Sequence, residues 1–294
     1  MSLECVVNNG QGQPGLRETA QPVVVRDVWM TFPGKQPGAD VHVLEKINLE
    51  VELGEFVCIV GPSGCGKSTL LNIIAGFLPA TKGNVVVEGE PLRGPDPRRV
   101  FVFQENGVFP WLTVRDNIGF GLLRKSAAER GRIVQHYVEM VGLTGFEKAY
   151  PRELSGGMRQ RVEIARALAA NPDIIYMDEP FGALDFITRL KMRTDLTRIW
   201  QQEKKTILFV THDIEEAVQL ADRVLVMSKR PATIQEEVRI DIPRPRDLDS
   251  PGYLRTRDRI FEAMGMSLRV GEADVGVGAT KVHVAERRIP TATG

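Results

Sequence analysis

The sequence has no apolar run long enough to cross a membrane. A spanning helix needs about 18 or more consecutive, largely apolar residues, and no window of this chain approaches that length. The polar N-terminus also lacks the apolar centre of a signal peptide. We therefore expect the chain to stay in the cytoplasm and to form no pore by itself.

Cysteine is scarce, and a net charge is absent. The three cysteines (Cys5, Cys58 and Cys65) lie far apart, which excludes the usual spacing of a metal site or a disulfide framework. The 38 basic residues balance the 38 acidic ones, so no overall basic field points to nucleic acid. A hydrophobic content of 43% over 294 residues indicates a globular protein of one large or two ordinary domains.

A glycine-rich loop stands between an apolar strand pattern at 56–60 and a helical pattern at 70–78. It matches G-x-x-x-x-G-K-[ST], in which glycines let successive backbone N–H groups point at phosphate oxygens and the helix adds its positive end. Lys67 is expected to reach the β- and γ-phosphates, and the Ser68 hydroxyl to bind Mg²⁺. The predicted nucleoside triphosphate site comprises Gly61, Pro62, Ser63, Gly64, Cys65, Gly66, Lys67, Ser68 and Thr69.

Two of the cysteines fall near this loop. Cys58 belongs to the apolar strand and is expected to pack in the core. Cys65 lies inside the loop, where N–H dipoles and Lys67 predict a lowered thiol pKa and sensitivity to oxidation.

Two carboxylates end a second apolar strand pattern at 174–177. In phosphate-loop NTPases an acid at a strand end holds Mg²⁺, and Asp178 fits that position. Glu179 is placed to polarise a water for in-line attack on the γ-phosphate.

A second glycine pair opens a helical pattern at Ser155, Gly156 and Gly157. A hydroxyl, two small residues and a helix N-terminus form another anion site. Because one γ-phosphate does not need two such sites, we expect this one to bind the nucleotide of a second copy of the chain.

Strand and helix patterns alternate along the chain and predict a mostly parallel α/β sheet. Residues 1–21 are polar and glycine-rich and are predicted to be disordered. Three helical patterns within 105–171 predict an inserted subdomain, and a last strand is expected at 238–242. Residues 246–294 are expected to form a short helix near 257–264 and a loose tail.

The chain resembles the ATP-binding subunit of an ABC transporter over about residues 22–245. The phosphate loop, the signature at 154–160 and the strand at 174–179 stand in the family's order, with Met158 where the family usually has glutamine. The resemblance implies a RecA-type phosphate-loop core with a mostly parallel sheet, an antiparallel β part and the inserted α-helical subdomain. It also implies hydrolysis of ATP with Mg²⁺ by two copies that sandwich two nucleotides.

Further residues take roles from this resemblance. Gln104 resembles the glutamine that senses Mg²⁺ and the γ-phosphate, and His212 resembles the switch histidine at the γ-phosphate. The loop at 183–185 resembles the one through which the two copies sense each other. Phe32 resembles the aromatic residue that stacks on adenine, with Trp29 as a competing candidate.

The stretch 104–114, together with 181–185 and 188–189, resembles importers of the nitrate, sulfonate and taurine group. Phe109, Trp111 and Leu112 would then line the groove that receives a helix of the membrane permease. The resemblance implies a peripheral subunit at the cytoplasmic face of the membrane. A solute-binding protein would act indirectly, through the permease, and the solute would not touch this chain.

Three alternative functions can be compared with the features of the sequence. An ABC ATPase acting on nucleic acid or ribosomes would usually have paired domains, coiled-coil insertions or basic modules, and this sequence contains none of these patterns. A phosphate-loop kinase would have no use for the second glycine motif. A binding module without chemistry is disfavoured because Lys67, Asp178, Glu179 and His212 are all present.

Overall fold

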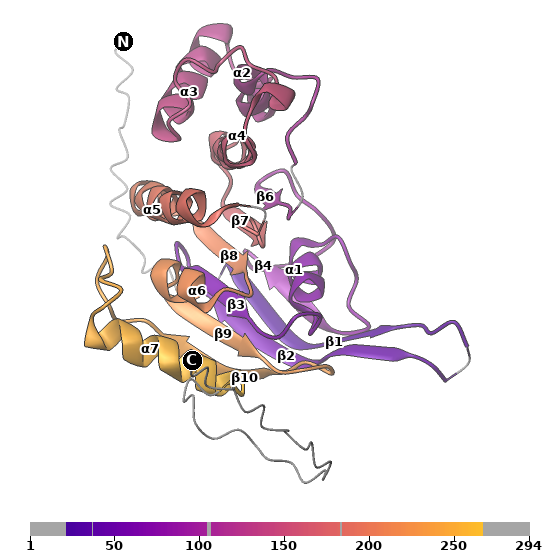
Figure 1. Ribbon diagram of the computed structural model, residues 1–294. Coiled ribbons are helices and arrows are strands. Elements are labelled where there is room, and N and C mark those ends of the chain that lie inside the picture. The colour runs from indigo at the N-terminus through magenta and orange to yellow at the C-terminus, as the bar shows by residue number, and fades with distance from the viewer. Residues whose placement is uncertain (1–21, 37, 105–106, 183, 267–294) are drawn as a thin grey trace, which may run out of the picture.

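Two sheets and a set of helices form the described part of the molecule (Figure 1). The structure is a computed structural model that describes residues 22–36, 38–104, 107–182 and 184–266. The larger sheet has six strands in the order β10-β9-β3-β8-β7-β6. Their bounds are β3 Phe56–Val60, β6 Arg99–Val102, β7 Ile174–Asp178, β8 Thr206–Val210, β9 Arg223–Met227 and β10 Ile234–Arg239.

Five of these strands run parallel, and β10 pairs antiparallel with β9 at the edge. The sequence prediction of a mostly parallel sheet is therefore confirmed. Strands β3, β7, β8 and β9 are buried along their whole length, as expected for a sheet covered on both faces. Because the carboxyl ends of parallel strands meet at one edge, the segments that follow β3, β7 and β8 are brought together there.

The smaller sheet is antiparallel, with the strand order β2-β1-β4-β5. It supplies the antiparallel part that the family resemblance implied. Its strands are β1 Val23–Phe32, β2 Val41–Val51, β4 Lys82–Val87 and β5 Glu90–Pro91.

Helix α1 (Lys67–Ala75) packs between the two sheets. Val57 and Ile59 of β3 belong to the same apolar cluster as α1 and the smaller sheet. The alternate residues Phe56 and Cys58 belong to a second cluster on the opposite face of the larger sheet. The alternation of side chains along one strand thus divides the core into two layers.

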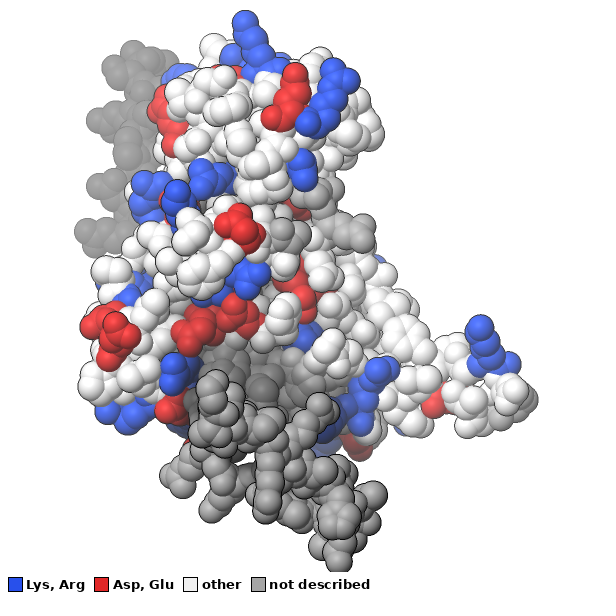
Figure 2. Space-filling view, in the orientation of Figure 1, with Lys and Arg blue, Asp and Glu red and all other residues white. Residues whose placement is uncertain are grey.

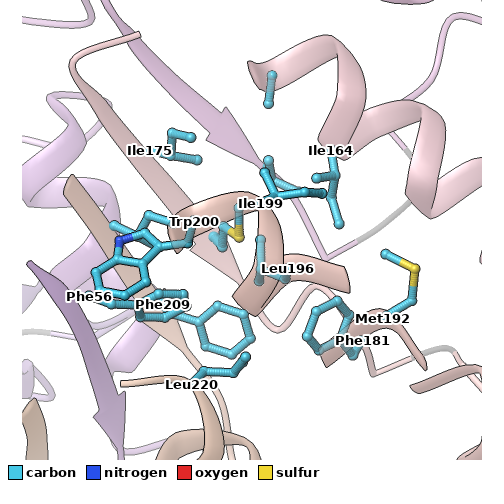
Figure 3. Packing of buried hydrophobic residues seen from close by; sticks show 14 of the residues in the cluster. Phe56, Ile164, Ile175, Phe181, Met192, Leu196, Ile199, Trp200, Phe209 and Leu220 are labelled. Carbon is cyan, nitrogen blue, oxygen red and sulfur yellow. The ribbon is translucent and has the colours of Figure 1, made fainter. Parts of the chain in front are cut away.

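Helices α5 (Phe186–Glu203) and α6 (Ile214–Leu220) cover that opposite face. Figure 3 shows the aromatic centre of this layer, where the Phe56 ring lies 6.0 Å from Trp200 and 5.8 Å from Phe209, between ring centroids. Phe181 lies 5.6 Å from Phe209 in the same way. Phe181 lies two residues after Glu179, the candidate catalytic carboxylate, so this packing fixes the start of the loop that follows β7.

The helices α2 (Val114–Ile118), α3 (Ala127–Met140) and α4 (Gly156–Ala169) form a separate group, with α2 and α3 above α4 in Figure 1. Short 3₁₀ turns at Phe120–Leu122 and Pro151–Glu153 connect them. The side chains of Thr113, Ser126 and Ser155 cap the three helices. The exact domain boundaries stay a prediction.

Two predicted elements near the C-terminus were misplaced. Strand β10 ends at Arg239 instead of extending to 242, and helix α7 spans Pro251–Ala263 instead of 257–264. Ser250 caps α7, and Pro251 fits the first helical turn, where no backbone N–H is needed. The predictions for 1–21 and for the tail at 267–294 lie outside the described residues.

Among the described residues, no helix has the length and apolar character that a membrane span requires. The face drawn in Figure 2 carries basic and acidic side chains next to each other instead of one large field of a single sign. This agrees with the balanced charge of the whole chain.

Candidate nucleotide site

The phosphate loop connects β3 to α1 and places Lys67 in a buried position, with 5% of its surface exposed. Its Nζ donates hydrogen bonds to the carbonyl oxygens of Gly61 at 3.0 Å and Pro62 at 3.2 Å. No ion pair with Lys67 is found among the residues that the structure describes. The ammonium therefore keeps its charge available for an anionic ligand.

Gly66 has to be glycine for two reasons. Its φ of 121° is disfavoured for other residues, and a Cβ built there would lie 2.7 Å from Cγ1 of Val43 in strand β2. The loop thus rests directly on the smaller sheet.

Asp178, the last residue of β7, meets Ser68 in the first turn of α1. The Ser68 hydroxyl donates to Oδ1 of Asp178 at 2.9 Å. Burial raises the pKa of Asp178, and the hydrogen bond from Ser68 partly opposes that rise. A desolvated carboxylate and a hydroxyl oxygen at this distance suit the oxygen coordination that Mg²⁺ prefers, with water completing the shell.

Glu179 follows at once and is the meeting point of three segments. Its Oε2 lies 3.0 Å from Nδ1 of His212 and 3.4 Å from Nε2 of Gln104. These three residues come from the ends of β7, β8 and β6. Glu179 has a φ of 44°, which is unusual for a residue with a side chain and is typical of strained positions at functional sites.

A cavity of about 440 Å³ lies over the loop and reaches Glu179. Phe32, 37% exposed, lines it, whereas Trp29 packs beneath Lys82, whose Nζ is 5.9 Å from the Trp29 ring centroid. This arrangement favours Phe32 over Trp29 as the adenine-stacking residue. The cavity is lined by Phe32, Val41, Val43, Ser63, Gly64, Gly66, Lys67, Ser68, Thr69, Glu179 and Arg230.

The sequence did not point to Val41, Val43 or Arg230. Val41 and Val43 lie on either side of His42 in β2, a spacing that indicates an ordinary half-buried strand. Arg230 lies in the turn between β9 and β10, outside every motif that the sequence analysis identified. Its place at the loop depends on strand order, which the sequence did not reveal.

The signature residues are arranged differently. Ser155 is exposed, and its Oγ accepts a hydrogen bond from the backbone N–H of Met158 at 3.3 Å. A Cβ built on Gly157 would lie 2.4 Å from Cγ2 of Thr188, so this glycine permits close packing of α4 on α5. The described residues that line the nucleotide cavity include none from 155–157. One chain therefore does not bring its own signature to its own loop.

Of the two predictions about cysteines near the loop, one is confirmed and one is wrong. Cys58 is fully buried in the core, as predicted. The lowered pKa predicted for Cys65 is wrong, because burial raises the pKa of its thiol more than Lys67 and the local N–H groups lower it. Cys5 lies outside the described residues, as does Ala183 of the loop at 183–185.

A buried ion-pair group supports the segment that carries His212. Asp213 caps α6, and Nη2 of Arg193 lies 2.5 Å from Oδ2 of Asp213 and 3.2 Å from Oε1 of Glu216. Arg189, one turn earlier on α5, donates to the carbonyl oxygen of Leu184 at 3.0 Å. Helix α5 thereby joins the loop after Glu179 to the helix after His212. The sequence analysis did not predict this connection.

The comparisons with known proteins agree with this geometry. An ABC transporter ATP-binding protein of Methanocaldococcus jannaschii, itself uncharacterized, is 51% identical over 229 residues, covering 77% of this chain and 86% of that protein. The chain belongs to the ABC transporter ATP-binding family. The family model described as ABC transporter matches residues 44–182 of this ABC ATPase.

An aliphatic sulfonates import ATP-binding protein of Bacillus cereus is 46% identical to this ABC ATPase, covering 78% of the chain and 90% of that protein. A dimeric ATP-binding cassette solved in a post-hydrolysis state with ADP and Pi superposes with a TM-score of 0.65 at 35% identity. The match covers 74% of this chain and 98% of the cassette. The predicted fold class, ATPase activity and use of ATP with Mg²⁺ are confirmed at the level of the family. The roles of individual site residues stay predictions.

Proposed function

We propose that this ABC ATPase energises the import of nitrate, a sulfonate, taurine or a related small solute through a separate membrane permease. It would work as a peripheral subunit at the cytoplasmic face, while a solute-binding protein delivers the solute to the permease. The observation that carries the proposal is the convergence of Gln104 and His212 on Glu179 beside the phosphate loop. The aliphatic sulfonate import relative supports the importer group.

Each residue at the convergence has a task in hydrolysis. Glu179 accepts a proton from the attacking water, and His212 holds that carboxylate and contacts the γ-phosphate. Lys67 neutralises charge on the β- and γ-phosphates. Ser68, Asp178 and Gln104 would hold Mg²⁺, which neutralises developing charge on the same phosphates.

A second copy of the chain would complete the site. The exposed Ser155 and the N-terminus of α4 present a hydroxyl and backbone N–H groups without a phosphate ligand from their own chain. The relative solved as a dimeric cassette supports two-copy assembly. We propose that Ser155, Gly156 and Gly157 of one copy bind the γ-phosphate held by Lys67 of the other.

An apolar groove of about 470 Å³ on the helical part supports docking of the permease. Trp111 is 70% exposed and Leu123 68% exposed on its rim, and Leu112 and Phe120 also line it. Phe109 supports the groove from within, with its ring centroid 4.6 Å from that of Phe120. Large exposed apolar side chains gathered in one place are typical of a protein contact.

Co-expression with a candidate permease of the nitrate, sulfonate and taurine import group tests the proposal. Membranes should retain the ABC ATPase, and the variant Trp111→Ala should reduce that retention. Leu53→Ala serves as the matched control, because it removes an apolar side chain that is 80% exposed and does not line the groove. Stable binding to ribosomes or DNA, with no recovery in membranes, would instead favour the nucleic-acid reading.

A further inference from the structure

The turn between β9 and β10 brings an arginine to the phosphate loop. Strand β9 pairs in parallel with β3, so the turn after β9 and the loop after β3 leave the sheet at the same edge. Arg230 in this turn lines the nucleotide cavity. A Cβ built on Gly64 would lie 3.4 Å from Nη2 of Arg230.

The turn is held firmly on both sides. Within it, Ser228 N–H donates to the carbonyl oxygen of Thr233 at 3.0 Å, and Thr233 N–H donates to Ser228 Oγ at 2.9 Å. Ala232 joins the turn to β2, donating to the carbonyl oxygen of Val43 at 2.9 Å and accepting from Glu45 N–H at 2.9 Å. The backbone that carries Arg230 is thus fixed beside the cavity before a ligand arrives.

The Arg230 guanidinium is free to bind an anion. Across the described residues, no hydrogen bond or ion pair joins its side chain to another group. Its positive charge acts on the loop residue Cys65. Burial raises the pKa of the Cys65 thiol, and the charges of Lys67 and Arg230 both oppose that rise. The cavity therefore has two positive groups, Lys67 within the loop and Arg230 at its side.

We propose that Arg230 binds the phosphate chain of the nucleotide, as a second cation beside Lys67. Nη2 of the guanidinium lies against Gly64, in the loop that is expected to hold the phosphates. Its planar donors suit paired hydrogen bonds to phosphate oxygens. This inference rests on the proposed role of the phosphate loop.

Calorimetric titration of the full chain with Mg-ATP tests the inference. Arg230→Gln should weaken binding about tenfold or more, as expected for loss of a charge-assisted hydrogen bond. Its affinity should also depend less steeply on salt, because one ionic contact with phosphate is gone. Arg230→Lys keeps the charge without the paired donors and should lose less affinity than Arg230→Gln.

Lys229→Gln is the matched control, because Lys229 is the adjacent exposed cation and lies outside the set of cavity-lining residues described above. It should bind Mg-ATP within about twofold of the unaltered chain. Equal losses in both variants, or an unchanged affinity or salt slope in Arg230→Gln, would overturn the inference. The thermal midpoint without nucleotide should stay the same, which shows that Arg230→Gln folds normally.

Lys67→Ala separates the two proposals. If Lys67→Ala abolishes Mg-ATP binding while Arg230→Gln has no effect, the phosphate-loop site stands and the role of Arg230 fails. If Lys67→Ala also leaves binding unchanged, the assignment of the site itself is wrong.

Discussion

The two candidate anion sites of this ABC ATPase differ in how complete they are within one chain. At the phosphate loop, Lys67 is buried and segments from β6, β7 and β8 converge on Glu179. At the signature, Ser155 is exposed, and its hydroxyl contacts the backbone of its own helix. One copy thus holds an assembled half of the candidate site, at the phosphate loop, and an open half, at the signature. This is the arrangement expected of a site shared between two copies.

The largest effect should come from the assembled half. Glu179→Gln keeps the shape of the side chain but removes the proton acceptor, so we expect steady ATP turnover to fall about a thousandfold. Nucleotide binding should persist, because Lys67 and the loop are intact. Glu90→Gln changes an exposed carboxylate in β5 and should leave turnover unchanged. Normal turnover with normal transport in Glu179→Gln would refute the assigned role.

The buried ion-pair group around Arg193, which supports the segment that carries His212, should contribute to the stability of the fold. Arg193→Gln removes the closer of the two arginines at the buried Glu216, together with the ion pair to Asp213, so we expect a loss of about 3 kcal/mol in the free energy of unfolding. Arg198→Gln removes an exposed pair with Asp195 on the same helix and should cost about 1 kcal/mol or less. Urea unfolding of the two variants measures the difference. Equal losses would show that the Arg193 group is not a buried support.

The open half can be tested without disturbing its helix. Ser155→Asp retains a good N-cap for α4 but places a negative charge where the partner's γ-phosphate should bind. We expect turnover to fall about tenfold or more, with an unchanged thermal midpoint and unchanged Mg-ATP affinity of the single chain. Unchanged turnover would indicate that Ser155 is a helix cap alone.

The smallest effect concerns the pH dependence of stability at Asp178, the candidate Mg²⁺ ligand. Because burial raises the folded-state pKa of Asp178, its contribution favours folding at low pH and is lost as the pH rises through the folded-state pKa. Asp178→Asn removes that dependence. In the absence of nucleotide, the thermal midpoint of this variant relative to that of the unaltered chain should therefore increase as the pH rises. A constant difference across pH would contradict this sign.

Local patterns explain which parts of the fold and site the sequence could predict. The phosphate loop and the start of the helix at Ser155 are set by neighbouring residues, so their motifs indicated them correctly. The place of Arg230 and the pairing of Arg193 with Asp213 depend on strand order and helix packing across the chain. The pKa of Cys65 was predicted in the wrong direction because burial, which the motif does not report, outweighs the nearby dipoles.

Sedimentation of the variant Glu179→Gln with Mg-ATP tests the shared site most directly. Because this variant should bind ATP without hydrolysing it, we predict an ATP-dependent dimer. Adding Ser155→Asp to the same chain should return it to a monomer that still binds Mg-ATP. A double variant that dimerises as well as Glu179→Gln alone would contradict the account that each nucleotide is bound between Lys67 of one copy and Ser155 of the other.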